Sequence, residues 1–344
     1  MRVEMNPQGM EIAWVSYVER HPRGTLRHLP LWRDLLLSCY PHRPHYLFAF
    51  GDDGEMCGLL PLMQVKSWLT GNRLVSLPFW QDCGPIGDSP GIEQHLVAEA
   101  ERLRQTLGCT YGEYRMRHPG LSGLEENRYY STYVLPLSAA DSVWHMLDPK
   151  SVRWAIRKSE RDGVTVRLGE GFKDVDAFCG INERTKKRLG VPWPARSYFA
   201  TLHERVGSGF KLYLAEYKGE LVAGAIVLRY KSTLEYAYAA SEKDSLQVKP
   251  NHLVLWRAIV DGCSDGFRLA DLGRTSPDNQ GLASFKRHWG TVETPLSYYF
   301  QPAMSRPMAL NRRGLKYRGA TAVWKHLPMS LARSVGPRAF ATLD

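Results

Sequence analysis

The sequence has little of what marks metal-binding or membrane-spanning proteins. Its six cysteines are scattered singly, with no CxxC pair and no Cys/His spacing of the kind that structural zinc requires. We therefore expect buried free thiols and no bound metal. No apolar segment follows the N-terminus, and no uncharged run approaches the roughly 18 residues that a membrane-spanning helix needs. These absences favour a cytoplasmic protein.

Familiar catalytic motifs are also absent. The chain has no G-x-S-x-G elbow, no H-E-x-x-H, no Walker loop and no G-x-G-x-x-G after a strand. This argues against a serine hydrolase, a zinc hydrolase, an NTPase and a Rossmann oxidoreductase. What the chain does have is positive charge, with 45 Lys and Arg against 35 Asp and Glu. Such a surplus attracts phosphate-bearing partners, so nucleic acid, anionic lipid and phosphorylated small molecules all stay open.

One order of elements occurs twice along the chain. Residues 45–67 predict a hairpin of two apolar strands that turns at residues 52–54. Residues 211–230 predict a second hairpin with a similar sequence. Each hairpin is followed by a strand, a helix and a strand. After the first hairpin these elements are predicted at 71–79, 92–107 and 110–117, and after the second at 232–241, 251–263 and 267–273. We predict an α/β (α+β) protein of two similar domains, each a mixed sheet flanked by helices.

The predicted domains span residues 1–140 and 141–302, and a basic helical tail follows at 303–344. The tail either packs back on the body as a helix or touches a membrane surface, which would place the protein at the inner face of the membrane.

The start of the second domain is rich in cations. A helix predicted at 149–164 carries Arg153, Arg157 and Arg161 at four-residue spacing, hence on one face. This face is either a solvated helix surface or an anion-binding surface. Two more helices are predicted at 174–189, with Asp174 as its cap, and at 196–206.

The segment GLASFKRHWG, residues 281–290, predicts a short amphipathic helix. Leu282, Phe285 and Trp289 recur at helical spacing and are expected to bury one face. Lys286 then lies at the border of that face, where its ammonium can reach a cleft. A cation near a helix C-terminus is also favoured by the helix dipole alone, so the spacing leaves both explanations open.

The repeated order of elements resembles the core of the GNAT acetyltransferase superfamily, and its doubling is similar to the FemAB/FemX family of aminoacyltransferases. Four stretches carry the resemblance, which covers roughly residues 12–300: SLPFWQDCGPIGD (76–88), IRKSERDGV (156–164), KPNHLVLWRAI (249–259) and LADLGRTSPDNQGLASFKRHWG (269–290). These four stretches look most like the sequences of FemAB-like proteins found beside exosortase and exopolysaccharide genes. The resemblance implies two tandem GNAT-like domains.

The resemblance also implies a reaction. Family members transfer an acyl or aminoacyl group directly to an amine, without a covalent enzyme intermediate. Their Phe-Lys pair matches Phe285 and Lys286 here, which makes both candidate catalytic residues. The lysine would stabilise the oxyanion of the tetrahedral intermediate, a contribution of about 3–4 kcal/mol for a single donor.

The donor implied by the family is aminoacyl-tRNA, and it would account for the basic charge. The candidate tRNA-binding residues are Arg153, Arg157, Arg161, Lys186 and Lys187. An acyl-coenzyme A donor normally needs a glycine-rich loop after the central strand, whereas residues 249–251 read Lys-Pro-Asn here. Either co-substrate stays open, and no other cofactor is expected.

Acceptor binding is assigned partly by resemblance and partly by position. Asp88 and Trp80 lie in the stretch that resembles the acceptor-binding segment of the family. Tyr236 and Tyr238 lie on the central strand of the second domain. One of them is expected to face a cleft, while alternation sends the other strand side chains into the core. Two further candidates, Asp271 and Arg274, flank Gly273 at a predicted strand end, where open sheets place site residues; the other interpretation is an ion pair that ties a loop.

Three functions remain open. The first is a FemAB-type N-acyltransferase that passes an aminoacyl group from tRNA to an amine of a cell-envelope or secondary-metabolite precursor. The second is an acyltransferase that uses acyl-coenzyme A or an acyl carrier protein on an amino sugar or amino acid. The third is a non-catalytic scaffold for exopolysaccharide machinery.

Overall fold

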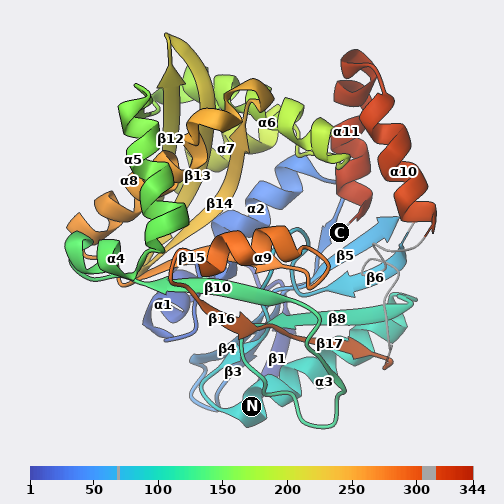
Figure 1. Cartoon of the computed structure of the whole chain (residues 1–344). Coiled ribbons are helices and arrows are strands. Elements are labelled where there is room, and N and C mark those ends of the chain that lie inside the picture. The colour runs from blue at the N-terminus through green and yellow to red at the C-terminus, as the bar shows by residue number, and fades with distance from the viewer. Residues whose placement is uncertain (68–69, 304–314, 344) are drawn as a thin grey trace. The chain divides into compact units, whose positions relative to one another are not determined.

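The structure, a computed structural model, describes residues 1–67, 70–303 and 315–343 (Figure 1). The chain divides into two units. Unit 1 comprises Met1–Tyr130, Pro295–Gly314 and Arg338–Asp344, and unit 2 comprises Ser131–Thr294 and Leu315–Pro337.

Within the described residues, unit 1 forms a smaller and a larger sheet. Its strands are β1 (Arg2–Met5), β2 (Arg43–Pro44), β3 (Leu47–Phe50), β4 (Met56–Leu60), β5 (Met63–Ser67), β6 (Gly71–Val75), β7 (Ile86–Gly87), β8 (Tyr111–Met116), β9 (Glu126–Asn127) and β17 (Ser297–Gln301). The smaller sheet has the order β1-β3-β4-β7 and the larger β2-β5-β6-β8-β17-β9. The helices are α1 (Glu11–Arg20), α2 (Pro30–Cys39) and α3 (Pro90–Thr106).

Proline explains why unit 1 has two sheets. The segment predicted as one hairpin at 45–67 forms β3, β4 and β5, because the chain breaks at Pro61 between β4 and β5. Proline has no N–H for a sheet ladder, so a strand interrupted there can send its halves to different partners. β4 pairs with β3, whereas β5 pairs with β6.

Unit 2 keeps the corresponding strand whole. Its strands are β10 (Ser131–Pro136), β11 (Thr165–Leu168), β12 (Phe210–Tyr217), β13 (Glu220–Tyr230), β14 (Thr233–Ser241), β15 (Leu269–Thr275) and β16 (Val292–Pro295). They form one sheet in the order β11-β12-β13-β14-β15-β10-β16. The sheet is mixed, because β14 and β15 run parallel whereas β12, β13 and β14 are antiparallel neighbours.

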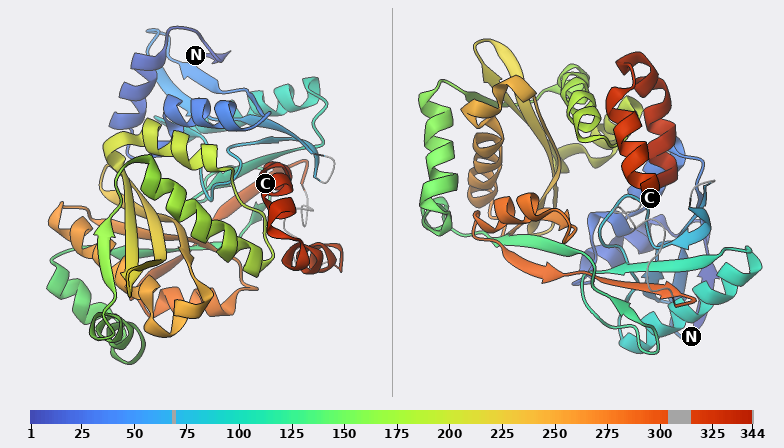
Figure 2. Two further views of the ribbon diagram at one scale, coloured as in Figure 1. Left: turned by 90° about the horizontal axis from the view of Figure 1, so that it is seen from above. Right: turned by 45° about the vertical axis from the view of Figure 1, so that its right-hand side comes forward.

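Helices cover both faces of the unit 2 sheet (Figure 2). The helices of unit 2 are α4 (Ala140–Met146), α5 (Trp154–Arg161), α6 (Gly171–Leu189), α7 (Arg196–Val206), α8 (Pro250–Ser264), α9 (Gln280–Arg287), α10 (Leu315–His326) and the first part of α11 (Met329–Leu343). α8 packs on one face with α5 outside it, and α6 packs on the other face. A core of aliphatic side chains from β13, β14 and α8 fills the α8 side. The predicted mixed sheets flanked by helices are thus confirmed.

The units divide at other points than the predicted boundaries of 140 and 302. β10 lies before residue 140 but pairs with β15 in the unit 2 sheet. β17 lies before residue 302 but pairs with β8 in the unit 1 sheet. Strand pairing between distant segments decides these assignments, and no local pattern in the sequence reports it.

Two predicted helix starts are wrong in detail. The helix predicted at 149–164 begins as a π-helical turn, Pro149–Arg153, before α5. Helix α6 begins at Gly171, so Asp174 lies inside its first turn instead of capping it. The Asp174 carboxylate accepts the backbone N–H of Glu170 at 2.7 Å and pairs with Arg167, which satisfies a helix-end donor from within. The end of α6 at Gly190 is as predicted, with φ of 76°.

The tail packs back on unit 2 through α10. The ammonium of Lys187 donates to the carbonyl oxygen of Lys325 at 3.2 Å, and Trp193 contacts Trp324 edge-on. This agrees with the first of the two predictions for the tail. Residues 304–314 lie outside the described residues, and the membrane contact stays a prediction.

All six cysteines are free thiols, as predicted. Three of them, Cys83, Cys109 and Cys179, are buried, whereas Cys39, Cys57 and Cys263 are only half-buried. The expectation that all six are buried was therefore wrong for three.

Candidate active site

The site is built around α9, whose limits follow from its caps. The side chain of Asn279 accepts the backbone N–H of Leu282 at 3.2 Å and starts the helix. The helix ends at Arg287, so its buried face is Ala283 and Lys286, one turn apart. The prediction that Leu282 helps to bury one face was wrong, because its side chain is exposed. Trp289 is fully buried, but it lies beyond the helix.

Lys286 is buried and held by three oxygen atoms of β15. Its ammonium donates to the carbonyl oxygen of Gly273 at 2.7 Å and to the Thr275 hydroxyl at 2.9 Å. A third contact, to the carbonyl oxygen of Arg274, is longer at 3.4 Å. The Tyr133 ring lies 5.4 Å from the ammonium. All of these oxygens are uncharged, so the lysine keeps its full positive charge in a buried place.

Burial changes the acidity of this lysine. Desolvation lowers the pKa of Lys286 to about 8, and the Asp271 carboxylate acts in the opposite direction. Near neutral pH the ammonium form still predominates. The site therefore offers a cation that attracts a developing negative charge and loses that ability as the pH rises past about 8.

Asp271 supports the seat of Lys286 from inside the protein. Its carboxylate is buried, accepts the Thr132 hydroxyl at 2.7 Å, and accepts the backbone N–H of Gly273 at 2.8 Å. Gly273 has φ of 79°, a left-handed conformation that side chains disfavour. The same glycine thus meets Asp271 with its N–H and Lys286 with its carbonyl oxygen.

β15 extends to Thr275, so the prediction that Asp271 and Arg274 flank a strand end was wrong. Both residues lie inside the strand. Arg274 is half-buried, and its Cα pairs with that of Thr132 on β10.

β14 and β15 part next to this seat. Their parallel pairing runs from Thr233↔Leu269 to Glu235↔Asp271, although both strands continue further. Just past that point, the register of β14 against β13 shifts and leaves Ala237 as an extra residue. Such a bulge bends a strand away from its neighbour. The geometry places Gly273 and Thr275, and with them Lys286, on the part of β15 that has left β14.

The bulge also separates the two candidate tyrosines. Tyr236 pairs with Val227 and packs in the core on the α8 side, where burial raises the pKa of its hydroxyl. Tyr238 pairs with Ile226 and faces α7, where its hydroxyl lies 2.9 Å from the hydroxyl of Tyr198. Regular alternation would put both tyrosines on one face, and the extra residue between them reverses one.

Phe285 is half-buried and contacts the first turn of α8. Its ring lies 5.2 Å from the His252 ring and 6.1 Å from that of Trp289. Burial lowers the pKa of His252 to about 4, helped by the nearby Lys249, so this imidazole is neutral at pH 7. The contact joins the start of α8 to the helix that carries Lys286.

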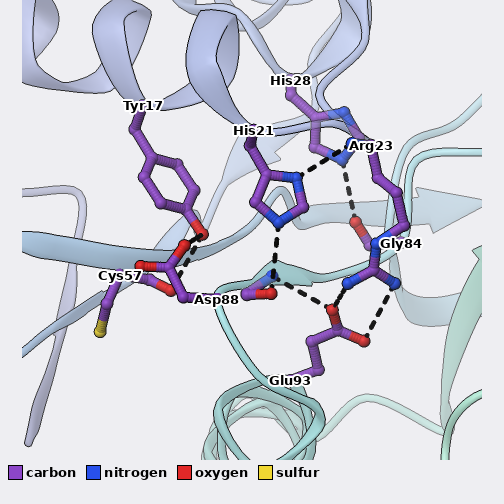
Figure 3. A network of polar contacts seen from close by, with 9 residues as sticks. Tyr17, His21, Arg23, His28, Cys57, Gly84, Asp88 and Glu93 are labelled. Carbon is purple, nitrogen blue, oxygen red and sulfur yellow. Dashed lines mark hydrogen bonds and ion pairs between the residues drawn. The ribbon is translucent and has the colours of Figure 1, made fainter.

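In unit 1, Asp88 follows β7 and is exposed. Figure 3 shows the Tyr17 hydroxyl between the Asp88 carboxylate, at 3.1 Å, and the carbonyl oxygen of Cys57, at 2.9 Å. Burial, followed by the charge of Asp88, raises the pKa of Tyr17 far above its usual value, so Tyr17 stays a donor. It orients the carboxylate without removing it from solvent.

The loop that presents Asp88 is held by two imidazoles and a buried carboxylate (Figure 3). His21 accepts the backbone N–H of Arg23 at Nδ1, which leaves Nε2 to donate to the carbonyl oxygen of Gly87 at 3.2 Å. His28 reaches the carbonyl oxygen of Gly84 at 3.0 Å, and burial lowers its pKa to about 4. Glu93 accepts the Gly87 N–H and pairs with Arg23.

Trp80 faces inward in unit 1. The guanidinium of Arg27 lies 4.1 Å from its ring centroid and the Trp32 ring lies 5.0 Å away. The preceding residue, Phe79, has φ of 72°, which is strained for an aromatic residue. These contacts support the loop before Asp88.

The predicted tRNA-binding residues differ in access. Arg157 and Arg161 are exposed, and the guanidinium of Arg157 lies over Trp144 at 5.4 Å. Arg153, Lys186 and Lys187 are half-buried, and the ammonium of Lys187 is engaged by α10. The accessible cations are thus those of α5.

Several residues around Lys286 were not singled out in the sequence. Thr132 and Tyr133 belong to β10, which the sequence assigned to the other domain. Thr275 stands eleven residues before Lys286, and only the turn between β15 and α9 brings the two together. No group of His, Cys, Asp and Glu that could hold a metal occurs among the described residues. No helix in the described part of the chain is long and apolar enough to cross a membrane.

Comparison with known proteins places this geometry in a fold. Residues 149–287 match the family model described as an acetyltransferase (GNAT) domain. A crystal structure of FemX superposes with a TM-score of 0.66 at 16% identity, covering 88% of this chain and 98% of that one. A tandem GNAT protein from the clavulanic acid biosynthesis pathway superposes with a TM-score of 0.51 at 12% identity, covering 87% and 98%.

A curated relative supports the same assignment. The UDP-N-acetylmuramoylpentapeptide-lysine N(6)-alanyltransferase of Weissella viridescens is 25% identical over 157 residues. The match covers 44% of this chain and 46% of the relative, so the chain spans about half the length of that protein. The fold of two tandem GNAT-like domains is confirmed, and the chain is FemAB/FemX-like. The link to exosortase and exopolysaccharide loci stays a prediction.

Proposed function

We propose that this FemAB/FemX-like chain is an N-acyltransferase that passes an aminoacyl group from aminoacyl-tRNA to an amine. The observation that carries the proposal is the buried ammonium of Lys286, seated at 2.7 Å on Gly273 and 2.9 Å on Thr275 within the GNAT-matched region. A buried cation bound only by neutral oxygens suits a reaction in which negative charge develops.

The chemistry follows from direct attack on an ester. As the amine nitrogen bonds to the carbonyl carbon, the carbonyl oxygen becomes an oxyanion. The oxyanion then reforms the carbonyl, and the ester oxygen leaves with the bonding electrons and takes up the proton that the amine gives up. Lys286 would give this oxyanion a hydrogen bond in place of its long contact, 3.4 Å, to Arg274. One such preorganised donor contributes about 3–4 kcal/mol to lowering the barrier. Phe285, packed on His252, would fix the helix that carries the lysine.

Two observations support tRNA as the donor. The exposed cations of α5 can bind phosphates. The residue before α8 is Lys249, with φ of 57°, where an acyl-coenzyme A site would have glycine. Aminoacyl-tRNA is a cytoplasmic molecule, so we place the reaction in the cytoplasm.

The acceptor would be an amine of a cell-envelope or secondary-metabolite precursor. The relative from Weissella viridescens is named for the lysine N6 amine that it modifies. Asp88 is an exposed carboxylate whose orientation is fixed by Tyr17, which suits the recognition of a cationic or hydroxylated acceptor. Tyr238 and Arg274 remain candidate contacts on the strands of unit 2, whereas Tyr236 packs in the core on the α8 side.

The test uses total tRNA charged with radiolabelled amino acids. The full chain should retain charged tRNA at low salt and release the label onto an added amine mixture, with retention falling steeply as salt rises. Product analysis by mass spectrometry then identifies the acylated amine. If charged tRNA is neither retained nor deacylated in the presence of any amine, the tRNA version of the proposal is wrong.

A second candidate donor is acyl-coenzyme A. The matched family model is that of an acetyltransferase domain, and this favours a thioester donor. Thermal stabilisation of the chain by acyl-coenzyme A, with none by charged tRNA, would establish this alternative. Lys286 would have the same role, because aminolysis of a thioester also passes through an oxyanion.

A further inference from the structure

An exposed indole stands out on α5. Trp154 is 48% exposed, and among the described Phe, Tyr and Trp residues of unit 2 only Phe172 is more exposed. The ammonium of Lys249, the residue before α8, lies 6.0 Å from the centroid of the Trp154 ring. A flat aromatic surface beside a cation is the combination that single-stranded nucleic acids use, because bases stack on the ring and phosphates meet the charge.

Further cations surround this indole. Arg153 and Arg157 lie one residue before and three residues after Trp154. Arg157 is exposed and rests on Trp144. The Nε of Arg153 is buried and has no hydrogen-bond partner within the described residues. We call Arg153, Trp154, Arg157 and Lys249 the α5 patch. It contains three positive charges and no negative one.

The α5 patch is connected to the proposed reaction centre through the start of α8. Lys249 immediately precedes α8, and His252 in the first turn of α8 contacts Phe285 at 5.2 Å. Phe285 is the neighbour of Lys286 in α9. A ligand on Trp154 and Lys249 would therefore lie at the start of the helix whose first turn packs against Phe285.

We propose that the α5 patch binds the unpaired 3′ end of the donor RNA, with a base stacked on Trp154 and phosphates on Lys249, Arg153 and Arg157. The acyl group of an aminoacyl-tRNA is esterified to the terminal ribose, so capture of the last nucleotides here would deliver the ester toward Lys286. The inference rests on the proposed function, since it names the part of the donor that one surface recognises.

The test is binding of a short RNA to the full chain, without any chemistry. The probe is a fluorescein-labelled tetranucleotide of sequence ACCA, and the readout is fluorescence anisotropy at low salt. Trp154→Ala should weaken binding about tenfold, within the range that stacking of one base contributes. Trp154→Phe should restore most of the affinity, because a phenyl ring still offers a stacking surface.

Lys249→Gln should act differently from the tryptophan variants. It removes a phosphate contact, so the slope of log affinity against log salt should become shallower by about 0.7 for a single strand. Trp154→Ala should leave that slope unchanged. Equal effects of the two substitutions on the slope would contradict the proposal that Trp154 stacks on a base and Lys249 binds a phosphate.

The matched control is Phe172→Ala. Phe172 is another exposed aromatic residue of unit 2, on α6, with 57% of its side chain accessible. Its loss should leave RNA binding unchanged. An equal loss of affinity in this control, or full affinity in Trp154→Ala, would overturn the assignment of the α5 patch.

The outcome separates this inference from the proposed function. If the unmodified chain retains charged tRNA and Trp154→Ala retains it equally, only the α5 patch assignment fails. If the unmodified chain binds neither the tetranucleotide nor charged tRNA, both fail together. Displacement of the tetranucleotide by coenzyme A at equal concentration would also overturn the assignment, because the patch would then serve a thioester donor.

Discussion

The two units bury positive charge in different ways. In unit 1, the buried guanidinium of Arg115 donates to Glu113 at 2.7 Å, and Arg73 faces the same carboxylate at 3.7 Å. In unit 2, the buried ammonium of Lys286 donates to carbonyl and hydroxyl oxygens only. The charge of Arg115 is neutralised by the carboxylate to which it donates, whereas a buried ammonium bound only by neutral oxygens retains its attraction for a negative charge that arrives later. The difference assigns Arg115 a structural role, and it is the reason for the catalytic role that we propose for Lys286.

Replacing the lone cation should have the largest effect. We expect Lys286→Met to slow aminoacyl transfer by about 100- to 1000-fold, because the oxyanion loses its only charged donor. Single-turnover deacylation of charged tRNA with saturating amine measures the chemical step. Lys173→Met, at an exposed lysine of α6, is the matched control and should react at the normal rate. A Lys286→Met protein that reacts as fast as the control would remove the catalytic assignment.

Breaking a paired charge should affect stability instead. We expect Arg115→Met to lower the free energy of unfolding by about 3 kcal/mol, because Glu113 is left buried without its main partner. Urea denaturation followed by circular dichroism measures the change. Arg102→Met, at an exposed pair with Glu99, should change the stability by less than about 0.5 kcal/mol. If both arginine variants are equally stable, the charges of unit 1 are not structural.

Asp271 is a buried carboxylate close to Lys286, although it forms no hydrogen bond with that ammonium among the described residues. Asp271→Asn keeps oxygen and amide atoms for Thr132 and Gly273 but removes the negative charge. We expect kcat to fall by about tenfold with little change in KM, since Asp271 is a positioning residue. Its charge raises the pKa of Lys286, so its removal should move the high-pH limb of the rate profile to lower pH. A lower rate with an unmoved profile would indicate a purely structural role.

We expect the smallest effect when only the pH is changed and the rate and stability of the unaltered protein are measured. Burial lowers the pKa of Lys286 to about 8, so the transfer rate should fall as the pH rises through that value. Above it, the unfolded chain still binds the proton that the folded chain has released. Stability contributed by this group should therefore rise with pH between about 8 and the usual lysine value of about 10.4. Melting temperatures of the unaltered protein and Lys286→Met, compared across this range, measure it; parallel curves would argue against a buried ammonium.

Two segments with similar sequences show how much of the strand arrangement a local sequence pattern can predict. Residues 54–62 and 219–228 have similar sequences, and both were predicted to belong to the second strand of a hairpin. The second segment lies in the single strand β13, whereas the chain breaks at Pro61 in the first, so that β4 ends at Leu60 and β5 begins at Met63. Proline's missing N–H was visible in the sequence, but its consequence, two sheets instead of one, depends on which strands lie beside each half.

The candidate site divides in the same way. Lys286 and Phe285 were singled out because the Phe-Lys pair of the resembling family matches them, and local spacing predicted the helix that carries them. Thr132 was missed, because it approaches Asp271 only through pairing of β10 with a strand more than a hundred residues away. One of Tyr236 and Tyr238 was expected to face a cleft, but only the extra residue in the register of β14 puts the two on opposite faces.

The sequence by itself determined the order of the elements, through apolar periodicity and the glycines and prolines that end helices and strands. It also determined that a lysine stands on the helix after β15. The tertiary structure alone decided which oxygens receive that lysine, which unit each of β10 and β17 joins, and that the ammonium is buried. Periodicity and turn signals act within a few residues of each other, whereas strand pairing and desolvation depend on segments that folding brings together from distant parts of the chain.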